Sequence, residues 1–541
     1  MVFSLQFARG IPIRSRKIHS ILVLHRKTLF STTETTPSPL ATSPVSSVNP
    51  SCYKTCLSKI LYRSFTMSSS PTKEQEETPT TGLNPHPGLT ADSNNDKNHK
   101  RKQSDEEKSE SEAKRKKKFG KNHTRRNPKD YDVNLSQRDR KPHEGSFANP
   151  ALREQFGIVD LNPPSEEDLK QKRVKRKVAL FLGFVGTKYG GFQMNAGQRT
   201  LQAEIELALY RAGMINEQNF GNTNKYSWSS SARTDKGVHA CAQVCSLKVE
   251  LLENEINDME LVRTRLQELL PDEIRVLDVV RVTQKFCAKT QRDKVRYSYM
   301  LPSFVLQSTW RSIFTEHGIP LTGRQDVAKK PLSDEEVQKL QSSLKEYRST
   351  SEQRELLQKA LKEYVGTHPF HNFTKGLKPG EASANRYIIS FDVQEPVVVD
   401  GVEWIPTQVV GQSFLLHQIR KMISMAIDVA RETASVKVLK KALSKHESIR
   451  VGLAPAQGLF LEMSFFDGYN RRKNQQQNEL PDIDWSGPSC PGRERWEDCR
   501  NMIRKHIVDE EDRQGNFVQY MYLQECIFDH RKFFGSAADE D

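Results

Sequence analysis

The chain has 541 residues, enough for two or more domains and a sizeable buried core. Only 36% of the residues are apolar and the mean hydropathy is −0.68, which predicts that part of the chain does not fold. The eight cysteines form no C-x-x-C pair, and no run of eighteen apolar residues occurs. This composition favours structural thiols in a reducing compartment over a zinc site or disulfides, and it excludes a membrane-spanning helix.

The net charge of +14 is unevenly distributed along the chain. Residues 1–66 hold nine Lys and Arg against one acid (+8), residues 67–170 hold twenty against nineteen (+1), and residues 171–541 hold the remaining +5. The region with the most regular hydrophobic pattern is therefore only mildly basic. An RNA-binding function has to be argued from local residues and not from the total charge.

Residues 1–66 are rich in Arg, Lys, Ser and Thr, and they include FARGIPIRSRKIHSILVLHRKTLF. Such a basic amphipathic segment predicts an organellar transit leader, which would direct a mitochondrial or other organellar form. A disordered basic tail without a targeting role is the alternative. The composition changes at Met67, which motivates the hypothesis of a second translation start that would omit the leader.

Residues 67–170 are polar, rich in proline and mixed in charge, which predicts disorder. Within them RK at 101–102 precedes KRKKK at 114–118, a spacing that resembles a bipartite nuclear import signal. The predicted location is therefore the nucleus, with an organellar form if the leader is used. The same charges would also suit an RNA backbone, or would simply be a solvated run.

The pattern in the first part of the remaining chain indicates strands and one amphipathic helix. KVALFLGFVG, from about Lys175, predicts a buried strand, and TLQAEIELALYRAG predicts a helix with Thr200 as its N-cap. Residues 245–251 alternate as a half-buried strand does, and further strands are predicted at IRVLDVVRV and RYSYML. Residues 171–300 form the first predicted half of the folded region.

The second half, residues 301–470, repeats this mixture. Residues 334–364 are expected to be helical, and YIISFDVQ and WIPTQVV are expected to be strands. GQSFLLHQIRKMISMAIDVARE places Leu415, Ile419, Ile423 and Ile427 on one helical face. Residues 471–541 are predicted as a polar linker followed by a helical extension. Strands mixed with amphipathic helices at short spacing predict an α+β fold.

The stretch SARTDKGVHA, residues 231–240, combines an acid with a flexible turn. Gly237 permits a tight bend directly after Asp235, and Arg233 and Lys236 favour the ionised carboxylate. An ionised acid in a turn suits a nucleophile or a base, but it suits a structural ion pair equally well. The motif alone therefore does not decide between chemistry and structure.

Together with five further segments in the same order, this motif resembles the TruA family of RNA pseudouridine synthases. The pattern covers roughly residues 175–470 and is most similar to the eukaryotic nuclear tRNA-modifying branch. The further segments are GTKYGGFQMNAGQRTLQAEIELAL, FCAKTQRDKVRYSYMLP, GTHPFHNFTKG, GQSFLLHQIRKM and APAQGLFLEMSFF. The resemblance implies a long, mainly antiparallel sheet, formed by two similar α/β halves around a central RNA-binding cleft.

The resemblance also implies an isomerase that breaks the C1′–N1 bond of uridine, rotates the uracil and rejoins it through C5. No atom is gained or lost, so neither a redox cofactor nor ATP is expected, and no metal ligand is assigned. Asp235 matches the catalytic acid of the family. It would attack C1′ or C6, or remove the 2′ proton, and the sequence does not choose among these steps.

Four other residues match family positions that hold the nucleotide or the acid. Tyr297 would stack on the flipped uracil and its hydroxyl would assist loss of the C5 proton. Arg420 would pair with Asp235, and Arg233 would hold the extruded nucleotide. Leu459 would wall the uracil pocket. Taken without the family, each is an ordinary residue: a packed tyrosine, a solvated helix charge, an exposed arginine and a core leucine.

Three histidine positions are interpreted as structural. His239 follows the acid closely but tolerates replacement in the family, and His368 and His371 lie among phenylalanines in a packed turn. His417 is interpreted as a packing residue or an RNA contact. These assignments leave Asp235 as the one acid expected to react.

The expected partner is tRNA, with mRNA and small nuclear RNA as further candidate substrates, and no membrane is expected. Two alternatives stay open: a member of the family that is specific for the anticodon stem-loop, and a catalytically silent RNA-binding protein on the same fold. A nuclear scaffold that uses the basic tail would explain none of the six motifs. The sequence leaves the oligomeric state and the role of the C-terminal extension undecided.

Overall fold

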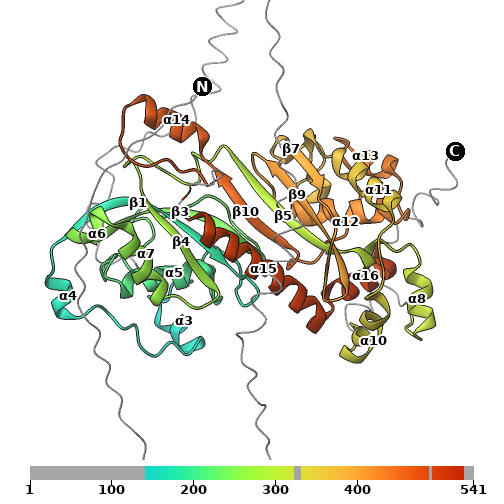
Figure 1. The fold of residues 1–541 in the computed structure, drawn as a ribbon, viewed down its shortest axis with the longest axis horizontal. Coiled ribbons are helices and arrows are strands. Elements are labelled where there is room, and N and C mark those ends of the chain that lie inside the picture. The colour runs from blue at the N-terminus through green and yellow to red at the C-terminus, as the bar shows by residue number, and fades with distance from the viewer. Residues whose placement is uncertain (1–140, 322–330, 486–489, 491, 529–541) are drawn as a thin grey trace, which may run out of the picture. The chain divides into compact units, whose positions relative to one another are not determined.

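A computed structural model describes residues 141–321, 331–485, 490 and 492–528. The predicted leader, Met67 and the import-like segment lie outside these ranges. Within the described part, no helix is both long and apolar enough to cross a bilayer. The described part carries one ten-stranded sheet with helices against it (Figure 1).

The main path of the sheet runs in the order β4-β1-β3-β10-β5-β9-β7-β6, with β2 added to β3 and β8 added to β9. All the pairings are antiparallel except that between β10 and β3. The strands are β1 (Arg173–Phe184), β2 (Ser229–Ser230), β3 (His239–Leu252), β4 (Ile274–Arg281), β5 (Lys294–Pro302), β6 (Gly366–Pro369), β7 (Asn385–Val393), β8 (Val397–Val399), β9 (Val402–Gly411) and β10 (Leu459–Phe465). The predicted α+β fold with a long, mainly antiparallel sheet is confirmed.

The sheet joins the two halves through strands that are distant in sequence. β5 pairs with β9 from Val295 to Pro302, and β10 lies between β3 and β5. The predicted boundary at residue 300 therefore cuts through β5, a strand that pairs only with later parts of the chain. β10 brings the end of the second half against the start of β3, where Phe460 aligns with His239.

Opposite faces of the sheet are covered by different helices. Tyr297 of β5 aligns with Val409 of β9, which in turn aligns with Phe391 of β7. On this face the Phe391 ring lies 6.2 Å from the ring of Tyr364, which follows α11 (Ser351–Lys362). Because side chains alternate along a strand, Ser298 points to the other face. There it donates to Glu462 at 2.9 Å, beneath α15 (Arg493–Gln514). Figure 1 shows α15 crossing the sheet on that face.

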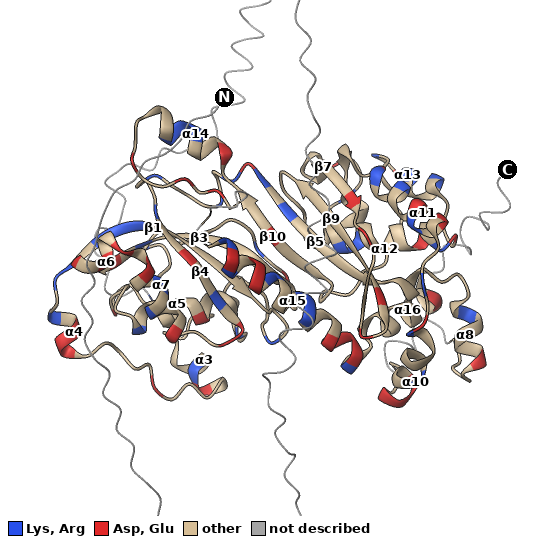
Figure 2. Cartoon of the chain, viewed as in Figure 1, with Lys and Arg blue, Asp and Glu red and all other residues tan. Residues whose placement is uncertain are grey.

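The face under α15 holds a buried acid. Glu462 is 2% exposed, and its carboxylate lies 3.1 Å from Arg296 and 3.6 Å from Arg500 of α15. These guanidinium groups lower the pKa of Glu462 although burial opposes the charged form. Figure 2 shows basic and acidic residues intermixed along α15, in keeping with the mild net charge of this region.

The helix that carries Arg420 is α12, Gln418–Ala430. Ile419, Ile423 and Ile427 form its buried stripe, as the sequence predicts, whereas Leu415 precedes the helix. The predicted helix at 200–213 is α5 (Leu201–Arg211), but the Thr200 side chain makes no capping hydrogen bond. Other α-helices of the described part are α6 (Glu253–Asn257), α7 (Met259–Glu268), α8 (Trp310–Glu316), α10 (Asp334–Leu344), α13 (Val436–Ala442) and α16 (Asn516–Ile527).

Three short helices were not expected from the sequence: α3 (Pro150–Gln155), α4 (Glu166–Lys170) and α14 (Asp467–Gln475). The segment 141–170, predicted to be disordered, is packed against the domain. Phe147 is fully buried, and the Ser146 hydroxyl donates to Glu206 of α5. Folded structure therefore begins earlier than predicted, because a few apolar anchors suffice to hold an otherwise polar segment.

Candidate active site

Asp235 lies in a short turn between β2 and β3. The Val238 amide donates to the Asp235 carbonyl at 3.1 Å, and Gly237 takes a φ of +78° to close the turn. The GG pair of TKYGGFQ supports it: the Phe192 amide donates to the Thr234 carbonyl at 3.1 Å. The Asp235 side chain is 26% exposed, so this turn presents a carboxylate that a ligand can reach.

His239 supports the Asp235 turn through hydrogen bonds to two other segments of the chain. The Gly186 amide donates to its Nδ1 at 3.0 Å, so the proton of the neutral ring is on Nε2, which donates to the Gln457 carbonyl at 3.1 Å. Complete burial, with His506 close by, lowers the pKa of His239 to about 3. The ring is therefore neutral and engaged on both sides, in agreement with its structural interpretation.

Tyr297 faces the same site from β5. Its side chain is 8% exposed, and its ring makes an edge contact with Phe414 at a centroid distance of 5.5 Å. Burial raises the pKa of Tyr297 to about 12; the charge of Asp235 adds to this effect and that of Arg292 opposes it. The hydroxyl thus stays protonated near neutral pH and is better suited to donate a hydrogen bond than to remove a proton.

Arg420 reaches the site from the first turns of α12. Its Nε donates to the Ala454 carbonyl at 2.7 Å, which ties the helix to the APAQGLF loop. Burial lowers the pKa of Arg420, whereas Tyr299 and Asp235 act in the opposite direction, so the guanidinium lies within reach of the Asp235 charge. Among the described side chains, however, the ion pair that the structure gives Asp235 is with His417.

The other two expected residues lie at different depths. Leu459 is 6% exposed and pairs with Tyr299, on the face of the sheet to which Tyr297 also points. Arg233 is exposed and donates to the Gln193 side chain at 2.9 Å. The structure therefore brings Asp235, Tyr297 and Arg420 together, while Leu459 lies buried on the same face of the sheet as Tyr297 and Arg233 lies at the surface.

Two charged or titratable groups of the site were not connected with the Asp235 turn from the sequence. Arg292 donates to the Ser231 carbonyl and, at 3.0 Å, to the Gln412 carbonyl, bridging the Asp235 turn to the end of β9. His417 lies 3.8 Å from the Asp235 carboxylate and was interpreted as a packing or RNA contact. Both fall inside the quoted motifs, but no local periodicity distinguishes them from surface residues.

The remaining histidines of the motifs are structural. His368 Nε2 lies 2.9 Å from the Val365 carbonyl, and His371 Nε2 lies 2.6 Å from the Glu447 carbonyl. Within the described ranges, no group of three or more His, Cys, Asp or Glu side chains is arranged to hold a metal ion. The HPFHNFT turn instead supports α12, since Lys421 donates to the carbonyls of Asn372 and Thr374 at 3.0 and 3.2 Å.

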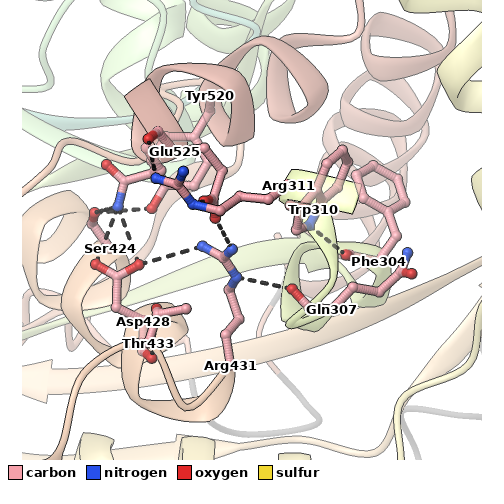
Figure 3. A network of polar contacts seen from close by, with 11 residues as sticks. Phe304, Gln307, Trp310, Arg311, Ser424, Asp428, Arg431, Thr433, Tyr520 and Glu525 are labelled. Carbon is pink, nitrogen blue, oxygen red and sulfur yellow. Dashed lines mark hydrogen bonds and ion pairs between the residues drawn. The ribbon is translucent and has the colours of Figure 1, made fainter. Parts of the chain in front are cut away.

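The far end of α12 is anchored by α16 (Figure 3). Arg431, which caps α12, pairs with the buried Glu525, and Gln524 donates to Asp428 at 3.2 Å. The Tyr520 hydroxyl donates to the Ser424 hydroxyl at 2.9 Å. Because these groups are buried and mutually satisfied, the C-terminal extension fixes the helix that presents Arg420.

The site joins a partly exposed carboxylate, a buried tyrosine and an arginine, which are groups suited to nucleophilic or acid–base chemistry. Comparison with known proteins agrees. A family model described as tRNA pseudouridine synthase matches residues 360–467. The chain is 34% identical over 357 residues to the mouse pseudouridylate synthase 1 homolog, covering 65% of this chain and 74% of that protein.

Two fungal relatives extend this similarity. A Saccharomyces cerevisiae protein named tRNA pseudouridine(27/28) synthase is 34% identical over 378 residues, covering 63% of this chain and 97% of that protein. A Schizosaccharomyces pombe tRNA pseudouridine synthase 1 is 28% identical over 416 residues, covering 58% and 77%. The chain belongs to the tRNA pseudouridine synthase family and is an isomerase. The family and reaction expected from the motifs are confirmed.

Proposed function

We propose that this protein converts specific uridines of tRNA to pseudouridine with Asp235 as the reacting residue. The observation that carries the proposal is the juxtaposition at one site of the partly exposed Asp235, the buried Tyr297 and Arg420. The reaction breaks C1′–N1 and forms C1′–C5; C5 loses one proton and N1 gains one, so the atoms balance. Asp235 either attacks the nucleotide or removes the 2′ proton.

The neighbouring groups then have distinct tasks. Arg420 places positive charge near Asp235, and Arg292 holds the Asp235 turn against the end of β9. The Tyr297 ring offers an apolar surface for the uracil, and its protonated hydroxyl can donate to a base oxygen. Leu459 supplies an apolar side chain to the wall of the uracil pocket. Arg233 projects into solvent, where a guanidinium can hold a nucleotide that has left the helical stack.

The substrate range and cellular location complete the proposal. One relative is named for positions 27 and 28 of tRNA, so these uridines are the first to map. Messenger and small nuclear RNAs are the further substrates that we propose. The import-like segment at 101–118 supports a nuclear form and the basic residues 1–66 support an organellar form. Loss of the organellar signal from a tagged chain that starts at Met67 would test the second form.

The test of the function uses the full chain and unmodified tRNA transcripts, with chemical mapping of pseudouridine. Asp235→Asn should bind tRNA as the wild type does and form no product. Asp400→Asn is the matched control, because Asp400 is an exposed turn residue at φ +51°, a conformation that Asn accepts. Product from Asp235→Asn at the wild-type rate would refute the assignment, and binding without product in every protein would favour a silent binder.

A further inference from the structure

His417 occupies an unusual backbone position directly beside the reacting acid. It is the residue before α12 and has a φ of +63°, a left-handed conformation that side-chain-bearing residues adopt rarely. Such backbone strain persists where the surrounding structure over-determines it and is frequent at functional sites. Here the strain directs the imidazole toward Asp235, with 3.8 Å between Nε2 and Oδ2.

The surroundings of His417 hold this position in place. The Thr374 hydroxyl donates to the Leu416 carbonyl at 2.9 Å, and Gln418 Oε1 accepts from the Leu415 amide at 2.8 Å, so the residues on both sides of His417 are hydrogen-bonded. The His417 side chain is 27% exposed. It therefore stands at the surface of the site and not in the core, where a merely packed histidine would be expected.

The charges that face His417 come from three elements. Asp235, in the turn before β3, favours the protonated ring; Arg420 and Lys421 of α12 and Lys375 after the HPFHNFT turn disfavour it. Partial burial is the largest influence, and the pKa of His417 is lowered from its ordinary value. The ring is consequently neutral at pH 7, and at 3.8 Å it lies beside the carboxylate without forming a close hydrogen bond to it.

We propose that His417 is a positioning residue that controls the availability of the Asp235 carboxylate. In the neutral form the imidazole orients the carboxylate and leaves it free to meet the nucleotide. In the protonated form the imidazolium pairs with Asp235 and withdraws it from the reaction. This inference rests on the proposed role of Asp235, and it assigns the acidic limb of the pH–rate profile to the imidazole.

The first measurement is the single-turnover rate of pseudouridine formation by the full chain between pH 5.5 and 8.5. Wild-type enzyme should slow by about tenfold for each pH unit below the imidazole pKa. His417→Asn keeps a residue that tolerates positive φ and removes the titrating ring; His417→Gly does the same with a freer backbone. Both variants should be severalfold slower at pH 8, yet should lose less rate on acidification, with tRNA binding retained.

A second measurement does not depend on turnover. A double-mutant cycle of thermal unfolding with Asp235→Asn and His417→Asn should show a coupling of about 1–2 °C in Tm at pH 5.5 that disappears at pH 8. Parallel acid limbs in wild type and both variants, or no coupling at either pH, would overturn the role of His417. Coupling at pH 5.5 with no product from any protein would instead support the contact and refute the proposed role of Asp235.

Discussion

His239 offers a quantitative test of how the Asp235 turn is supported. The side chain is completely buried and its folded-state pKa is about 3, against about 6.5 for an exposed histidine. Below pH 6.5 the unfolded chain takes up a proton that the folded chain refuses until about pH 3. The contribution of His239 to the free energy of unfolding is therefore fully present above pH 6.5. It decreases as the pH falls below 6.5, by about 1.4 kcal/mol per pH unit.

The perturbation is His239→Gln, whose amide can still accept from one neighbour and donate to another but does not titrate. Between pH 7.5 and 5.0 the wild type should lose about 2 kcal/mol more stability than the variant, because about 1.5 pH units lie below the unfolded pKa. The variant itself should be less stable at pH 7.5 by about 1–3 kcal/mol if either hydrogen bond is impaired.

Urea unfolding at the two pH values measures both quantities. The contributions of the other histidines cancel in the comparison, since they are present in both proteins. Equal losses of stability in wild type and His239→Gln would mean that His239 is protonated in the folded state, which would refute the neutral, doubly hydrogen-bonded ring.

Three further predictions concern the supports of the site. Glu525→Gln removes the buried charge that pairs with Arg431 and Arg311, leaving Arg431 with Asp428 and the Gln307 carbonyl. It should cost about 3 kcal/mol in urea unfolding and reduce the single-turnover rate. Gly191→Ala should slow catalysis at least tenfold in the same rate assay, because Gly191 has φ +112° and its added methyl would lie 3.2 Å from the Thr234 carbonyl. Tyr297→Phe should slow the reaction about 100-fold, with tRNA binding nearly unchanged in a filter-binding assay. Between pH 7.5 and 9.5 the rate of this variant should change with pH as the wild-type rate does, because the pKa of Tyr297 is about 12.

Matched controls separate local from general effects. Glu494→Gln removes an exposed acid of α15 and should be neutral. Gly197→Ala introduces a methyl at φ +67° where nothing lies within 4 Å, so it carries the backbone strain without the contact. If Gly197→Ala slows catalysis as much as Gly191→Ala, the packing against Thr234 is not the cause. A rate of Tyr297→Phe that diverges from the wild type with rising pH would identify the hydroxyl as a titrating base.

Local periodicity was sufficient for the elements that pack one face inward. The alternation at 245–251 and the stripe of Ile419, Ile423 and Ile427 identified β3 and α12, and hydrophobic runs identified β1 and β4. Local patterns did not place β10 between β3 and β5, because that order depends on contacts over more than 150 residues. They also missed α14, whose residues are almost all polar.

The residues of the site also divide into those that the sequence identified and those that only the structure shows. The motifs identified Asp235, Tyr297 and Arg420, which the structure brings together, but not the contact between Asp235 and His417. That contact requires a left-handed residue at 417, and its conformation is fixed by packing at the end of α12 and not by its neighbours in sequence. Glu462 illustrates the same limit. An acidic residue in a strand is expected to be exposed, and its pairing with Arg500 of a later helix is visible only in the structure.

The anchoring of α12 by α16 has a consequence for how the protein is made. Arg431 and its partner Glu525 are 94 residues apart, so the ribosome completes Asp235, Tyr297 and Arg420 well before the helix that secures them. A chain that ends near residue 515 contains every reacting group but lacks α16, which anchors α12, the helix that carries Arg420. A premature stop codon that removes α16 should therefore be a loss-of-function allele, even though the six quoted motifs are translated intact.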